Sequence, residues 1–253
     1  MRINACAATD GVRWVTQGLR LLVRQPLGLP AMTVIYFFMH MLVIFGAVGV
    51  IITAVVSPFA VLGLMGACRE IAAGRMPTPA VYITPFKEPG QRKRLLQLGA
   101  ANAALIVVVS LLILLAGVGE LIQVDGSKAP TMADIDWDNL RWGNVIGVLL
   151  LTAPILLLMW FAPMLAGWHG AGPGKAMFGS LVACWRNMSA MLVFGLAVSA
   201  VILAAATVLG VLLGLLGSSK ELISILFAPA SLVLLAVVQA GTYAMYTAVI
   251  GES

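Results

Sequence analysis

Long apolar runs separated by short polar breaks make up most of this 253-residue sequence. A helix needs about 20 mostly apolar residues to cross about 30 Å of hydrocarbon, and six runs come close to or exceed that length. The pattern therefore predicts an all-α fold, a polytopic membrane bundle of six transmembrane helices arranged as three hairpins. The predicted spans are residues 29–47, 50–72, 95–118, 143–167, 188–216 and 222–248.

Residues 9–25 have an amphipathic pattern instead. Polar and basic residues recur at helical spacing on one face, apolar residues recur on another, and Trp14 falls near the boundary. The first set is Arg13, Gln17, Arg20 and Arg24, and the second is Val12, Val15, Leu19 and Leu22. Such a helix either lies in the headgroup layer or packs against the end of the bundle. A second short helix is expected at residues 174–186, after a Gly/Pro break.

The polar segments between spans differ in charge. Residues 69–94 form a basic, proline-rich loop, whereas residues 119–141 form an acidic loop. Twelve of the fifteen Lys and Arg residues fall on the side of the membrane that holds the N-terminus and the loop of residues 69–94. The other three are Lys128, Arg141 and Lys220. Because loops rich in Lys and Arg remain in the cytoplasm, we expect both termini to be cytoplasmic and residues 119–141 to be external.

Composition supports a membrane protein throughout. The chain is 61% hydrophobic and 10% charged, whereas soluble domains carry about 25% charged residues. Residues 1–253 therefore form a single integral membrane domain, and we expect a bacterial inner-membrane location. The net charge of +5 suits anionic headgroups at span ends, and no zinc-finger spacing or basic–aromatic face points to nucleic acid.

Residues that could carry chemistry are few. Cys6, Cys68 and Cys184 have no CxxC spacing, and the sequence contains no Walker loop or HExxH motif. No acidic or basic residue lies near a span centre, which argues against ion coupling. His40 is the polar exception: either it binds haem or copper, or, as we favour, it is a neutral side chain bound to a carbonyl or hydroxyl. We expect no enzyme activity, no cofactor and no metal.

Two groups of residues are candidate binding surfaces. His169, Lys175 and Arg186 could contact an anionic headgroup, or, as we favour, His169 simply extends to the interface. Small residues form stripes that allow close helix packing, within the bundle or with a partner. These are Gly210, Gly214, Ala236, Ala240, Ala244 and Ala248.

A longer motif resembles a known family. The motif comprises Trp160-Phe161-Ala162-Pro163, His169-Gly170 and Ala183-Cys184-Trp185-Arg186-Asn187. It resembles an uncharacterised family of proteobacterial multi-pass inner-membrane proteins, and the hairpin plan is distantly similar to the membrane domain of some glycerophosphodiester phosphodiesterases. The resemblance implies the topology and no established activity.

Two functions are consistent with these patterns. The first is a non-enzymatic accessory, assembly or scaffold component that packs against other membrane proteins or a second copy. The second is a carrier or flippase-like protein for a lipid or small apolar solute, with a cavity lined by Thr53, Asn102, Ser110 or Gln239.

Overall fold

The computed structural model describes residues 3–115, 142–215 and 220–251, and every regular element in this part is a helix. The predicted all-α class is therefore confirmed. The predicted acidic loop, residues 119–141, lies outside the described residues. The elements are α1 (Asp10–Arg24), α2 (Gly28–His40), the 3₁₀ segment η1 (Met41–Phe45), α3 (Gly46–Ala72), α4 (Ala80–Lys87), α5 (Pro89–Leu115), α6 (Trp142–Trp160), α7 (Ala162–Trp168), α8 (Pro173–Arg186), α9 (Met188–Leu215) and α10 (Lys220–Ile250).

Five described segments are long and apolar enough to cross a membrane. The first, Gly28–Ala72, contains both α2–η1 and α3. The chain reverses at Gly46, whose φ of 67° favours glycine, and Gly49 lets α3 approach the carbonyl of Leu42 closely. The first two predicted spans are thus one helical run folded back on itself, so five segments account for six predicted spans.

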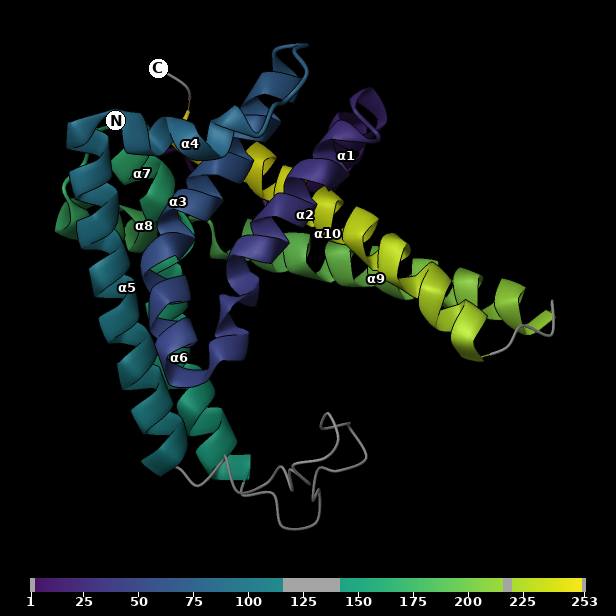
Figure 1. Cartoon of the computed structure of the whole chain (residues 1–253). Coiled ribbons are helices and arrows are strands. Elements are labelled where there is room, and N and C mark those ends of the chain that lie inside the picture. The colour runs from purple at the N-terminus through teal and green to yellow at the C-terminus, as the bar shows by residue number, and fades with distance from the viewer. Residues whose placement is uncertain (1–2, 116–141, 216–219, 252–253) are drawn as a thin grey trace.

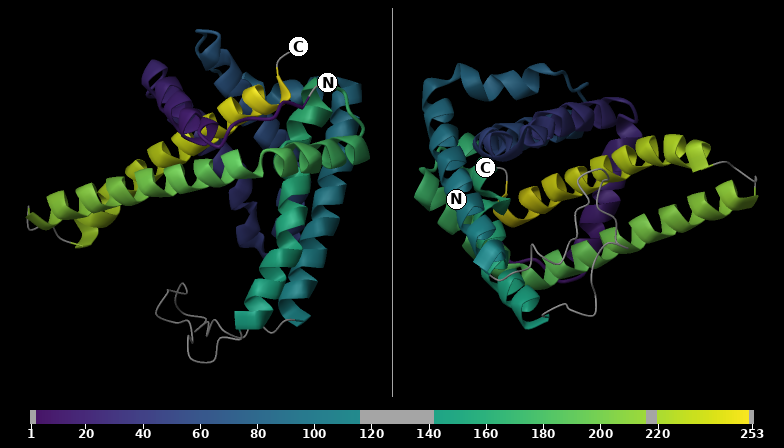
Figure 2. Two further views of the ribbon diagram at one scale, coloured as in Figure 1. Left: turned by 180° about the vertical axis from the view of Figure 1, so that it is seen from behind. Right: turned by 60° about the horizontal axis from the view of Figure 1, so that its bottom comes forward.

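The helices form two groups. Helices α2, α3, α5 and α6 run side by side, while the α9–α10 hairpin projects away from them (Figure 1). The view from behind shows the same separation, and both termini lie at the end where the two groups meet (Figure 2). That end also holds most of the buried core.

A bend at Phe161 interrupts the fourth predicted span. Helix α6 ends at Trp160, and α7 starts with Pro163 in its first turn. A proline there removes a helical N–H donor. Ser180 Oγ accepts the N–H of Phe161 at 2.9 Å and donates to the carbonyl of Leu157 at 2.6 Å, so α8 holds the bend.

Helix α1 packs one face against α9 and α10 at the end of the bundle, and its opposite face is exposed. Its buried face comprises Gly11, Trp14, Val15, Gly18 and Leu21. Trp14 is only 1% exposed, so its predicted place near the polar boundary was wrong.

The predicted apolar face of α1 was also wrong in part, because Val12 and Leu19 are exposed. Backbone contact explains the difference: a Cβ on Gly18 would lie 2.6 Å from the carbonyl oxygen of Val237 in α10. Gly11 and Gly18 therefore set the packing face of α1, because a residue without a side chain lets α1 come this close to α9 and α10.

Candidate functional site

The turn after α7 brings polar and aromatic side chains together at the end of the bundle. His169 Nε2 lies 2.7 Å from Tyr246 Oη of α10. The Trp168 ring meets the Tyr246 ring edge-on, with centroids 5.3 Å apart. The guanidinium of Arg69, from α3, lies 5.3 Å from the centroid of the Trp168 ring. This cluster joins α3, α7 and α10.

Two side chains of α5 cap the end of α7. Gln91 Nε2 donates to the carbonyl of Gly167 at 3.0 Å, and Arg94 Nε donates to that of Ala166 at 3.0 Å. The last carbonyls of a helix have no partner within it, so these bonds serve the structure.

The structure does not bring His169, Lys175 and Arg186 together. Lys175 and Arg186 stand at opposite ends of α8, eleven residues apart and hence about 16 Å along the axis. Both are exposed. Burial lowers the pKa of His169, and the positive charge of Arg69 lowers it further. His169 is therefore a neutral partner of Tyr246, and it adds no charge to an anion site.

His40 sits in a local environment. Its Nδ1 lies 2.9 Å from the carbonyl oxygen of Tyr36, one turn earlier in α2, and the two rings are 4.3 Å apart. The carbonyl belongs to its own helix. In the described part of the chain, no three His, Cys, Asp or Glu residues gather as a metal site.

The predicted small-residue stripes divide into two environments. Ala236, Ala240 and Ala244 are buried where α10 packs against its neighbours, and Ala248 is half-buried. Gly210 and Gly214 of α9 are exposed, and a Cβ on either would meet nothing within 4 Å. The alanines therefore serve internal packing, whereas the two glycines face outward.

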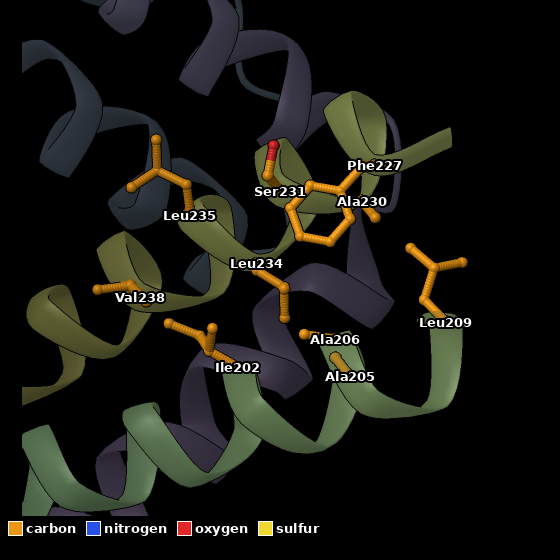
Figure 3. Close-up of a pocket in the computed structure, with 10 residues that line it drawn as sticks. All are labelled: Ile202, Ala205, Ala206, Leu209, Phe227, Ala230, Ser231, Leu234, Leu235 and Val238. Atoms are coloured by element: carbon orange, nitrogen blue, oxygen red, sulfur yellow. The ribbon is translucent and has the colours of Figure 1, made fainter. Parts of the chain in front are cut away.

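An apolar cavity of about 350 Å³ separates α9 from α10 (Figure 3). Its lining is hydrocarbon apart from the hydroxyl of Ser231. The lining residues are Ile202, Ala205, Ala206, Leu209, Phe227, Ala230, Ser231, Leu234, Leu235 and Val238. Such a surface suits an acyl chain or another apolar molecule and offers almost nothing to a polar one.

The residues expected to line a carrier's cavity lie elsewhere. Asn102 Nδ2 donates to the carbonyl of Ala54 at 2.9 Å, which joins α5 to α3. Thr53 is buried, and its hydroxyl has no hydrogen-bond partner in the described structure. Ser110 is exposed and Gln239 is half-buried. None of the four lines the α9–α10 cavity.

Asn187 had no assigned role from sequence, yet its side chain is fully buried and makes three hydrogen bonds. Its Oδ1 accepts the N–H of Cys6, and its Nδ2 donates to the carbonyls of Asn4 and Ala183. A polar residue between a helix and an apolar span gives a weak signal, because its partners come from the distant N-terminal segment.

One curated protein relates to almost the whole chain. The probable inner membrane protein BTH_II0599 of Burkholderia thailandensis is 31% identical over 257 aligned positions, which cover 99% of this chain and 94% of that protein. No family model and no solved structure matches. The comparisons show no similarity to glycerophosphodiester phosphodiesterases.

Proposed function

Because this chain belongs to the family of the inner-membrane protein of Burkholderia thailandensis, we propose that it is a non-catalytic accessory or assembly component of the inner membrane. In this proposal both termini are cytoplasmic, and the outer face of α9 binds a transmembrane helix of another membrane protein. The multi-pass helical architecture and the named relative support the membrane location; the partner is our proposal.

The exposure of α9 carries the proposal. Among its 28 residues, only Ala190, Phe194 and Leu213 are buried. Exposed apolar residues alone indicate only contact with lipid. Gly210 and Gly214, however, leave an open strip on that helix, and paired small residues four apart let a second transmembrane helix approach closely. Helix α9 projects from the rest of the bundle (Figure 2), so a partner can reach this strip.

The test compares glycine-to-leucine variants in native membranes. The double variant Gly210→Leu/Gly214→Leu fills the strip, and Gly147→Leu in α6 is the matched control because its Cβ also meets open space. After gentle detergent extraction, we expect the wild type and Gly147→Leu to co-purify a stoichiometric membrane protein that the double variant loses. Recovery of a second copy of this chain as the partner would show self-association. A monodisperse wild-type monomer without a partner would contradict the proposal.

The apolar cavity favours a second candidate, a carrier for a lipid or small apolar solute. Ala206→Phe would fill the cavity, whereas the Gly210→Leu/Gly214→Leu variant leaves its lining unchanged. In vesicles carrying a fluorescent phospholipid, a carrier would increase movement of the lipid between leaflets, and Ala206→Phe would abolish that increase. Equal rates in protein-free and wild-type vesicles would reject this candidate.

A further inference from the structure

A basic cavity of about 280 Å³ lies between α1 and α10, near the two termini. Thr247 in its wall is two residues before Val249, whose carbonyl accepts the N–H of Asn4. Three elements form the wall: α1, the last residue of α3, and the final turns of α10. The lining residues are Gln17, Arg20, Leu21, Arg24, Ala72, Tyr243, Ala244 and Thr247.

The helical spacing of three polar residues in α1 places them on the face that lines this cavity. Gln17, Arg20 and Arg24 fall on one helical face, three and four residues apart. Gly18 brings the backbone of α1 against Val237 of α10. The arginine side chains therefore start close to the surface of α10.

The positive charge of the cavity is not neutralised within the described residues. Asp10 of α1 pairs with Arg13, and Glu70 of α3 pairs with Arg75. Neither of these carboxylates lines the cavity, and Glu88 does not line it either.

The two arginines differ in what they already bind. Arg24 Nη1 donates to the carbonyl of Ala72 at 3.5 Å, a long bond that serves the end of α3 and uses one of its five donors. Arg20 has no hydrogen bond or ion pair in the described structure and is exposed. Capping the end of α3 is therefore one role of Arg24, but it gives no role to Arg20.

The position of the cavity along the membrane span indicates that lipid headgroups surround it. The last membrane-span candidate is Pro229–Ile250, and the α10 residues of the cavity belong to its final turns. Lipid headgroups lie at the ends of a span. Arginine matches the geometry of phosphate oxygens through paired N–H donors, while Leu21 and Ala244 offer apolar surface beside them.

We propose that this cavity binds the phosphate group of an anionic phospholipid, with Arg20 and Arg24 as donors and the α1–α10 wall holding the adjoining glycerol. The site does not include His169, Lys175 or Arg186. The proposal holds whether the protein is a scaffold or a carrier.

The test measures retained lipid on the full-length protein. The protein is purified in mild detergent with added phosphatidylglycerol, and bound lipid is counted by native mass spectrometry. We expect Arg20→Gln and Arg24→Gln each to lower the apparent affinity about fivefold, since each charge near a membrane surface contributes about 1 kcal/mol. Arg186→Gln, an equal change in net charge at an exposed helix end, should leave this tightly retained lipid in place.

Charge-conserving variants separate a built site from general attraction. Arg20→Lys should weaken retention although the net charge is unchanged, because lysine lacks the paired donors, and Arg186→Lys should have no effect. Equal losses in Arg20→Gln and Arg186→Gln, or no loss in either cavity variant, would overturn the proposal. Displacement of the lipid by millimolar inorganic phosphate would overturn the lipid assignment in favour of a soluble phosphate compound.

Discussion

The side-chain oxygen of Asn187 accepts a hydrogen bond from the backbone N–H of Cys6 at 2.7 Å, across 181 residues of sequence. The Nδ2 group of Asn187 donates to the carbonyl of Asn4 at 3.0 Å. Asn4 in turn bonds through its own N–H to the carbonyl of Val249. One buried amide thus fixes the N-terminal segment between the α8–α9 junction and the end of α10.

Asn187→Ala should release this N-terminal segment. It leaves the N–H of Cys6 and the carbonyl of Asn4 without this partner, and each lost hydrogen bond costs about 0.5–1.5 kcal/mol. Burial, and secondarily the charge of Asp10, raises the pKa of the Cys6 thiol, so release should lower that pKa and speed maleimide labelling. The measurement is the labelling rate at pH 7.5 in a Cys68→Ser/Cys184→Ser background. An unchanged rate would show that Asn187 does not hold the segment.

Alanine at Gly18 and at Gly210 should have opposite effects on stability. Both residues lie inside helices, where Ala is favoured over Gly by about 1 kcal/mol. At Gly18 the added Cβ would lie 2.6 Å from the carbonyl oxygen of Val237, and backbone cannot move aside cheaply. We expect Gly18→Ala to destabilise the protein by about 1–3 kcal/mol and Gly210→Ala to leave its stability equal or higher. Thermal unfolding in detergent measures both, and equal midpoints would contradict the packing of α1.

Acid should weaken the His169–Tyr246 contact. The pKa of His169 in the folded protein is lower than its ordinary value of 6.5, mainly because of burial, and the positive charge of Arg69 adds to the effect. The unfolded chain therefore takes up the proton more readily, so this contribution to stability is complete above about pH 6.5 and decreases as the pH falls below it. When the pH is lowered from 8 to 5, the thermal midpoint of unfolding should decrease. It should decrease less in His169→Gln than in the wild type. An identical slope in that variant would assign the pH dependence to other groups.

The proposed orientation predicts where a reporter will act. With most arginines on the cytoplasmic side, an alkaline phosphatase fused near residue 130 should be active, and one fused near residue 90 should be inactive. The comparison with residue 90 controls for expression. Cytoplasmic behaviour at residue 130 would reverse the assigned topology.

The hydrophobic pattern was sufficient to predict the all-α membrane class. A helix can cross the membrane when its run of apolar residues is long enough for the thickness of the bilayer. The length of that run is a local property of the sequence. The short helix at residues 174–186 was equally local: α8 is Pro173–Arg186, because a Gly/Pro break precedes it.

The pattern was less informative about which residues meet. A glycine reads as a weak helix position, so the packing of α1 through Gly11 and Gly18 could not be distinguished from an interfacial helix with Val12 and Leu19 buried. Likewise, nothing near Asn187 in sequence identifies Asn4 and Cys6 as its partners. The anion site expected at His169, Lys175 and Arg186 assumed proximity that α8 prevents by its length.

The sequence by itself determined that this chain is a multi-pass helical membrane protein, because hydrophobicity acts on each segment separately. Only the tertiary structure decided that Trp14 is buried, that His169 pairs with Tyr246, and that Arg20 and Arg24 face a cavity beside α10. Those relationships depend on backbone approach and on contacts between residues far apart in the chain, which no local pattern of polarity encodes.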